Sequence, residues 1–255
     1  MDRLTIIKVG GKVVEEPESL SALLDQFKKI SGYKLLVHGG GRTATAISEK
    51  LGIVTQMVDG RRITDAETLE VVTMVYGGLV NKRIVAALQA RGMNAVGLTG
   101  ADLNLIKAHK RPVNEINYGF VGDVDDVNVS ELRLLIEENV VPVVAPLTHD
   151  ANGQLLNTNA DTIAAELATE LSNFYKVFLF FCFEKRGVLL NPDDESTLIY
   201  DLSLPQFNEY KAEGVINAGM IPKLENGFRA KMKGVQEILI TNPENISTGR
   251  GTRLV

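Results

Sequence analysis

The sequence predicts an α/β protein, an open αβα sandwich with a mainly parallel central sheet. Short apolar runs alternate with stretches of helical periodicity along all 255 residues, which is typical of a parallel sheet covered by helices on both faces. A hydrophobic content of 45% is sufficient for a substantial core. The length fits one large or two small domains. We expect a boundary near Ser172, with lobes over residues 1–172 and 173–255.

The apolar runs define the strands, and the spacing of leucines defines the helices. Residues 17–30 begin with a proline and place Leu20, Leu23, Leu24 and Phe27 on one helical face. Strands are predicted over residues 4–9, 35–37, 95–98, 140–145, 177–183, 237–240 and 252–255. Helices are predicted over residues 17–30, 42–51, 65–91, 162–171 and 224–233.

Two stretches depart from a plain strand or helix. Residues 65–91 read as one long helix, although Gly77 and Gly78 lower its stability and mark close packing. Residues 103–126 contain Pro112, Gly119 and Gly122, and this composition predicts β-hairpins instead of a βα unit.

Composition limits the partners and the cell compartment. The net charge is −5 and the pI is about 5.4, which argues against a nucleic-acid partner. The lone Cys182 lies in an apolar run and is expected to be a buried thiol in a reducing cytoplasm. Lys8 and Gly10 interrupt the first apolar run, so no signal peptide is expected. No uninterrupted apolar run reaches the ~18 residues that span a membrane. We expect a soluble cytoplasmic protein without a membrane partner.

Two glycine clusters follow predicted strands. Gly10-Gly11 follows residues 4–9, and Gly39-Gly40-Gly41 follows residues 35–37. Bare backbone amides at the end of a strand, followed by a helix, bind anions. Lys8 precedes the first cluster, at the edge where open α/β sheets bind ligands. The clusters therefore predict a site for two anionic groups that face each other, as phosphoryl transfer to an acidic acceptor requires.

The second cluster also allows a different interpretation. Residues 39–44 match the pattern G-x-G-x-x-A, and Asp59 follows twenty residues after Gly39. This pattern is a dinucleotide-binding fingerprint, so an oxidoreductase stays an alternative. The fingerprint usually lies on the first βαβ unit of a chain, where this chain carries Lys8 instead.

Polar side chains in two connecting segments are candidates for binding. Arg62 follows Arg61 between two predicted elements, and a fixed arginine can grip a carboxylate through two parallel bonds. Asn157, Asn159 and Asp161 alternate along an extended segment and therefore share one side. Capping of the next helix accounts for one of the three, and the surplus predicts ligand binding.

Lys223 lies at the start of the helix predicted over residues 224–233, after Gly219 and Pro222. A cation there opposes the helix dipole unless it neutralises a bound phosphate. The basic residues Lys107, His109, Lys110 and Arg111 are interpreted as solvated. The sequence has no Cys/His metal-ligand pattern, no recognisable Ser-His-Asp triad and no P-loop of the pattern G-x-x-x-x-G-K-[ST].

Six motifs, in their order and spacing, resemble the amino acid kinase family along the full chain. They are residues Lys8–Gly11, His38–Gly41, Gly60–Arg62, Asn157–Asp161, Gly219–Lys223 and Gly251–Arg253. The resemblance implies an N-terminal lobe that binds an acyl amino acid and a C-terminal lobe that binds ATP. It also implies ATP-dependent phosphorylation of the side-chain carboxylate of an N-acylated glutamate, acetyl or succinyl, in arginine biosynthesis. Alternatives within the family are kinases of free glutamate, aspartate or carbamate.

The resemblance also implies a role for each matching position. Lys8 and Lys223 are expected on the transferring phosphoryl group, and Asp161 is expected to orient them. The small-molecule substrate is expected to contact Gly40, Gly41, Arg62, Asn157 and Asn159. ATP, carrying Mg²⁺, is expected to contact Gly10, Gly11, Glu184, Gly187, Val215 and Asn217. The acceptor carboxylate, with an ordinary pKa of about 4.3, is already ionised and needs no general base. The protein itself is expected to hold no resident metal.

Three departures from the family pattern carry further expectations. Residues 183–186 replace the usual Ser/Thr-Asp-Val before Gly187, which puts the nucleotide contacts there in question. Lys12 and Arg42 are extra cations after the two glycine clusters. One hypothesis places them near the acyl end of the substrate, where they would favour succinyl over acetyl; the other leaves them in solvent. The chain starts directly at its first strand, so a homodimer without arginine feedback is expected.

Overall fold

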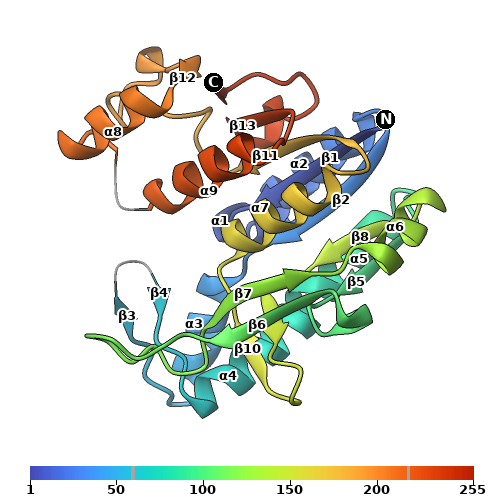
Figure 1. Ribbon diagram of the computed structural model, residues 1–255, viewed down its shortest axis with the longest axis vertical. Helices are drawn as coiled ribbons and strands as arrows, with labels where there is room; N and C mark the ends of the chain where they lie inside the picture. Colours follow the sequence, from blue (N-terminus) through green and yellow to red (C-terminus); the bar gives the residue numbers. More distant parts are fainter. Residues whose placement is uncertain (59–60, 217–218) are drawn as a thin grey trace.

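A twisted eight-stranded sheet forms the centre of the computed structural model, which describes residues 1–58, 61–216 and 219–255 (Figure 1). In spatial order its strands are β12 (Asp201–Leu202), β14 (Thr252–Leu254), β13 (Glu237–Thr241), β11 (Lys176–Cys182), β1 (Arg3–Val9), β2 (Tyr33–His38), β8 (Val141–Val144) and β5 (Ala95–Leu98). The described neighbours run parallel except β13 and β14, which pair antiparallel. The predicted open, mainly parallel sheet is confirmed.

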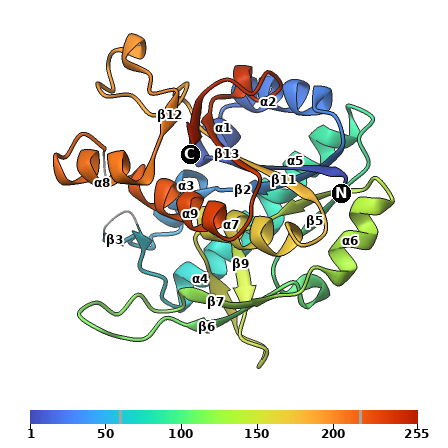
Figure 2. The same ribbon diagram turned by 45° about the horizontal axis from the view of Figure 1, so that its top comes forward.

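Helices cover both faces of this sheet (Figure 2). One face carries α6 (Ser130–Glu137), α7 (Ala160–Leu171), α8 (Leu204–Ala212) and α9 (Ile221–Met232). The other face carries α1 (Gly11–Glu15), α2 (Pro17–Lys29), α3 (Gly41–Lys50), α4 (Ala66–Val72) and α5 (Asn81–Gln89). This arrangement is the three-layer αβα sandwich predicted from the sequence.

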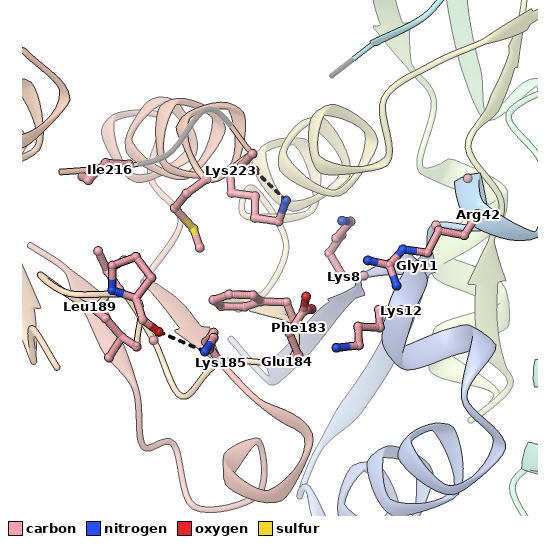
Figure 3. Close-up of a pocket in the computed structure, with 18 of the residues that line it drawn as sticks. Lys8, Gly11, Lys12, Arg42, Phe183, Glu184, Lys185, Leu189, Ile216 and Lys223 are labelled. Carbon is pink, nitrogen blue, oxygen red and sulfur yellow. Dashed lines mark hydrogen bonds between the residues drawn. The ribbon is translucent and has the colours of Figure 1, made fainter. Parts of the chain in front are cut away.

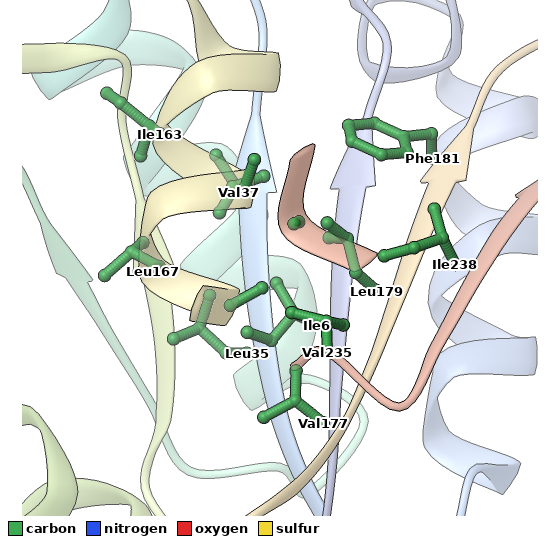
Figure 4. Close-up of a cluster of buried hydrophobic side chains, with 14 of the residues drawn as sticks. Ile6, Leu35, Val37, Ile163, Leu167, Val177, Leu179, Phe181, Val235 and Ile238 are labelled. Carbon is green, nitrogen blue, oxygen red and sulfur yellow. The ribbon is translucent and has the colours of Figure 1, made fainter. Parts of the chain in front are cut away.

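The alternation of side chains along β1 fixes which layer each residue joins. Leu4 and Ile6 pack under α7 and α9, whereas Ile7 and Val9 pack under the opposite helices. Figure 4 shows Ile6 in the first of these two core layers, with Leu35 between it and Leu167 of α7. Because Lys8 follows the same alternation, its side chain emerges on the α7 side of the sheet.

Two smaller sheets lie beside the main one. Strands β10 (Leu155–Asn157), β9 (Leu147–His149), β6 (Ile106–Lys110) and β7 (Gly122–Val127) form a four-stranded sheet, and β3 (Met57–Val58) pairs with β4 (Arg61–Arg62). The antiparallel pair β6 and β7 confirms the hairpin predicted within residues 103–126. The elements η2 (Asp102–Asn104), η3 (Glu195–Thr197) and η4 (Pro243–Asn245) are short 3₁₀ helices.

The long helix predicted over residues 65–91 is present but changes its winding. Asp65 caps it by accepting a 2.8 Å hydrogen bond from the Thr68 amide. Between α4 and α5 the chain forms a π-helical segment, η1 (Thr73–Val80), around Gly77 and Gly78. The stretch Ala66–Gln89 has a mean hydropathy of 1.3 and is long and apolar enough to span a membrane by those criteria alone. Core helices of water-soluble proteins meet the same criteria, and α4 and α5 contribute to the core here.

The sequence analysis did not predict helices α1, α6 and α8 or the short strands β3, β4, β9, β10 and β12. The expected lobe boundary at Ser172 falls between α7 and β11. The central sheet continues across it, because β11 pairs with β1 on one side and β13 on the other.

Candidate active site

Two lysines and one aspartate meet at the carboxyl end of β1. Lys8 Nζ lies 2.8 Å from one carboxylate oxygen of Asp161, and Lys223 Nζ lies 3.4 Å from the other. Asp161 belongs to the first turn of α7 and Lys223 to the first turn of α9, so three separate elements supply the cluster. Lys8 and Asp161 are both buried. The three residues predicted to act on the phosphoryl group are thus brought together.

Burial and charge act against each other in this cluster. Burial lowers the pKa of Lys8 below its usual 10.5, and the nearby Asp161 offsets only part of that effect. Burial would raise the pKa of Asp161, but the charges of the two lysines outweigh it and hold the pKa below its usual 3.8. At neutral pH the aspartate is therefore ionised and keeps both ammonium groups in place.

The two glycine clusters lie side by side. A Cβ placed on Gly39 would lie 3.3 Å from the Gly11 amide nitrogen, and one on Gly11 would lie 3.8 Å from the amides of both Gly40 and Gly41. This close backbone approach follows from the parallel pairing of β1 and β2, whose carboxyl ends share one edge. The sequence prediction that the clusters form one anion site agrees with this geometry.

The side chain of His38 contacts the backbone of the triple glycine. Its Nδ1 lies 2.7 Å from the Gly39 carbonyl oxygen, and its Nε2 lies 3.2 Å from the Asn81 side-chain amide. Burial lowers the pKa of His38 to about 4, so the ring is neutral at physiological pH. A neutral ring that donates from Nδ1 and accepts at Nε2 satisfies both contacts and fixes the glycine backbone.

Two cavities open from the lysine cluster, and they share Lys8, Gly39, Gly40 and Gly41. The larger has a volume of about 500 Å³ and the smaller about 280 Å³. Of the predicted nucleotide residues, the larger cavity is lined by Gly10, Gly11, Glu184, Gly187 and Val215. Of the predicted substrate residues, the smaller is lined by Gly40, Gly41, Arg62, Asn157 and Asn159. Asn217 lies outside the residues that the structure describes.

Arg62 is held in a fixed position in the smaller cavity. Its Nη2 donates to the Gly41 carbonyl oxygen and to Thr45 Oγ1, each at 2.8 Å, and its Nη1 donates to Thr55 Oγ1 at 3.1 Å. Asn157 donates to Thr64 Oγ1 at 3.0 Å. Asn159 caps α7 by accepting from the amides of Asp161 and Thr162. One of the three alternating polar residues is therefore the helix cap that the sequence analysis anticipated.

Tyr76, Arg111 and Arg229 are among the residues of the smaller cavity that sequence reasoning did not place there. The ring of Tyr76 packs against Gly40, where an added Cβ would lie 3.0 Å from it. The position of Tyr76 next to Gly77, a marker of close packing, was the sequence signal that could have identified it. The interpretation of Arg111 as solvated is wrong, because the strand β7 residue Asp123 binds it at 2.5 Å and turns it inward. Lys107, His109 and Lys110 are exposed, as expected.

Arg42 and Lys12 line the larger cavity, not the smaller one. Figure 3 shows both beside Gly11, on the same side as Lys8 and facing Glu184. The hypothesis that they contact the acyl end of the substrate is therefore not supported by their position. Which cavity Lys12 and Arg42 face depends on how α1 and α3 are rotated about their axes. The spacing of residues in the sequence does not determine that rotation.

Cys182 is buried at the end of β11, as predicted. Burial raises the pKa of its thiol, so it stays protonated and unreactive at neutral pH. Among the described residues, no group of three or more His, Cys, Asp or Glu side chains could hold a metal ion.

An αβα sandwich that carries, at the carboxyl ends of its strands, two adjoining cavities lined by lysine, arginine and glycine residues is suited to phosphoryl transfer between two bound small molecules. The chain belongs to the amino acid kinase family, whose sequence model matches residues 3–242. It is 60% identical to the acetylglutamate kinase of Bacteroides thetaiotaomicron over 99% of this chain and 98% of that protein. It is 58% identical to the acetylglutamate kinase of Parabacteroides distasonis over the full length of both.

A solved structure supports the same fold. The crystal structure of smu.665 from Streptococcus mutans UA159 matches with a TM-score of 0.83 and 26% identity, covering 99% of this chain and 98% of that one. Family membership supports the phosphotransferase interpretation of the triple glycine over the dinucleotide-binding alternative. Asp59, which that alternative requires, lies outside the described residues.

Proposed function

We propose that this protein uses ATP to phosphorylate the side-chain carboxylate of an N-acylated glutamate, giving an acyl phosphate, as the acetylglutamate kinases of arginine biosynthesis do. The junction of two cavities at Lys8, Asp161 and Lys223 carries the proposal. Two small anions can bind there end to end, with both ammonium groups at their point of contact. The high identity to acetylglutamate kinases over the whole chain supports the same substrate class.

The smaller cavity suits the acceptor. Arg62 and Asn157 would bind its α-carboxylate, and the amides of Gly40 and Gly41 would bind the carboxylate that reacts. That carboxylate is already an anion at neutral pH, so the enzyme needs no general base. Its main task is to offset the repulsion between the acceptor and the phosphoryl group, which Lys8 and Lys223 are placed to do.

The larger cavity suits the nucleotide, with Gly10, Gly11, Glu184, Gly187 and Val215 on its walls. We propose that Mg²⁺ arrives with ATP. Glu184 is the one carboxylate among the described residues that line this cavity, which fits a metal held mainly by phosphate oxygens and water. There the ion would neutralise charge on the phosphates.

An acyl-phosphate trapping assay with hydroxylamine tests the proposal directly. We expect ATP-dependent hydroxamate formation from N-acetylglutamate or N-succinylglutamate, and little from free glutamate or aspartate. Product from the free amino acids alone would contradict the proposal and favour another kinase of the family. Stabilisation of the protein by NAD but not by ATP with Mg²⁺ would instead favour the oxidoreductase alternative.

One observation bears on the acyl group. Arg111 contributes a guanidinium to the smaller cavity, and its Nη1 is buried without a hydrogen-bond partner among the described residues. A buried, unpartnered donor is costly unless a ligand satisfies it. An N-succinyl group carries a third carboxylate, which Arg111 could bind in addition to Asp123. We therefore keep succinyl as a second candidate acyl group.

Replacing Arg111 by leucine tests this candidate. If Arg111 binds a succinyl carboxylate, kcat/KM for N-succinylglutamate should fall about tenfold to a hundredfold, with N-acetylglutamate changed less than about threefold. Lys110→Gln serves as the control, because Lys110 is the exposed residue that precedes Arg111 at the end of β6. A clear preference of the unaltered enzyme for N-acetylglutamate, or equal losses on both substrates, would contradict this candidate.

The lobes, the assembly state and the location complete the proposal. We propose an acceptor-binding lobe over residues 1–172 and a nucleotide-binding lobe over 173–255. We propose a homodimer, because Met74 and Leu79 are exposed on the apolar stretch Ala66–Gln89. A soluble, cytoplasmic enzyme is consistent with the relatives it matches.

A further inference from the structure

Half of the positive charge in the lysine cluster is cancelled within the cluster. Lys8 and Lys223 carry two positive charges, and Asp161 pairs with both of them. The cluster therefore has a net charge of about one positive unit. A nucleoside triphosphate brings several negative charges. Mg²⁺ that arrives with the nucleotide offsets part of this charge, and in a protein whose overall net charge is −5 the rest is offset by cationic residues near the site.

Lys12 and Arg42 are placed to supply this positive charge. Both line the larger cavity next to Gly11, and neither side chain has an ion pair or a hydrogen bond to any described residue. Figure 3 shows the guanidinium of Arg42 near Gly11 and the ammonium of Lys12 on the side that faces Glu184. These are two free cations at one mouth of a cavity of about 500 Å³.

The local structure also favours an anion beside Arg42. Arg42 is the second residue of the ten-residue helix α3, which has no acidic residue in its first turn. A cation at this end opposes the helix dipole, and a bound anion relieves the conflict. On the opposite side of the cavity, Lys223 likewise lies in the first turn of α9, and that turn also has no acidic residue. The cavity thus lies between two helix ends that carry cations.

We propose that Lys12 and Arg42 bind the phosphate groups of the nucleotide that precede the transferred one. In this role the two residues determine how much more tightly the protein binds a nucleotide with three phosphates than one with a single phosphate. This inference rests on the proposed function, because it takes the larger cavity as the nucleotide site. It assigns to both residues a role different from contact with the acyl group, which would require them in the smaller cavity.

The variants Lys12→Met and Arg42→Gln test the inference by nucleotide binding alone. Calorimetric Kd values for AMP-PNP, ADP and AMP should be measured at fixed Mg²⁺ without any acceptor. For AMP-PNP we expect Kd to rise about tenfold in each variant, the effect of one charge-assisted hydrogen bond. AMP binding should change less than about twofold, and the salt dependence of AMP-PNP binding should become shallower.

Two matched controls remove a lysine elsewhere. Lys50→Gln alters the opposite end of α3, and Lys29→Met alters the exposed end of α2. Both controls should leave all three Kd values unchanged. Thermal unfolding of each variant checks that the fold is retained.

The outcomes separate this inference from the proposed function. Equal losses for AMP and AMP-PNP, or unchanged nucleotide binding with a raised KM for the acyl glutamate, would overturn the inference. Loss of AMP-PNP affinity in a protein that phosphorylates no acyl glutamate would support the inference and refute the proposed acceptor. Absence of AMP-PNP binding by the unaltered protein would overturn both.

Discussion

Replacement of Lys8 by methionine should lower kcat by about a hundredfold to a thousandfold, the usual effect of removing one group that stabilises a developing charge. Methionine keeps the length of the side chain but removes the ammonium 2.8 Å from Asp161. The acceptor should still bind, because Arg62 and Asn157 are untouched. We therefore expect a change in kcat much larger than any change in the KM of the acyl glutamate, measured by the hydroxamate assay.

Lys34→Met is the matched control, since Lys34 lies on the neighbouring strand β2 near its opposite end. Its activity should equal that of the unaltered enzyme. If Lys8→Met raised the KM of the acyl glutamate and kept the kcat of the unaltered enzyme, that result would contradict a role for Lys8 on the transferring phosphoryl group.

The lowered pKa of Lys8 adds a pH signature. Because burial moves this pKa below 10.5, the ammonium loses its proton earlier than an exposed lysine as the pH rises. The activity of the unaltered enzyme should therefore decline on the alkaline side below pH 10.5. The residual activity of Lys8→Met should lack that decline. On the acid side, ionisation of Asp161 imposes no limit until the pH falls below 3.8.

Much of the fold follows from local pattern. The buried parallel strands appear as continuous apolar runs, and each is found within two residues of its predicted limits. The adjacency of the two glycine clusters also follows, because consecutive parallel strands end at one edge. The short helices were missed for a physical reason: α8, for example, buries only Phe207 among its described residues, which is too little to give a helical period.

The site was harder to predict in full. That Lys8 and Lys223 share one carboxylate depends on how α7 and α9 pack, and only the family resemblance indicated it. Tyr76 reaches the triple glycine through the π-helical winding of η1, which the helical period does not reveal. Arg111 lies just beyond β6 and bonds Asp123, which the register of β6 on β7 pairs with His109, two residues before Arg111.

Asp161→Asn should damage both stability and activity. The change leaves two ammonium groups close together without their shared carboxylate. Removing one partner of a buried ion pair typically costs about 3–5 kcal/mol of unfolding free energy. The pKa of Lys8 should fall further, since Asp161 raises it and Lys223 lowers it. We expect kcat to drop on the order of a hundredfold and its alkaline decline to begin at a lower pH.

The double variant Lys8→Met/Asp161→Asn distinguishes an electrostatic cause from a packing defect. If the stability lost in Asp161→Asn comes from the uncompensated charge on Lys8, then removing that charge should restore much of the loss. The double variant should thus be more stable than Asp161→Asn alone by about 1–3 kcal/mol in denaturant unfolding. Strictly additive losses would show that the asparagine disturbs the packing of α7 instead. In both outcomes the activity of the double variant should not exceed the residual activity of Lys8→Met, because neither variant has the Lys8 ammonium to stabilise the phosphoryl group in transit.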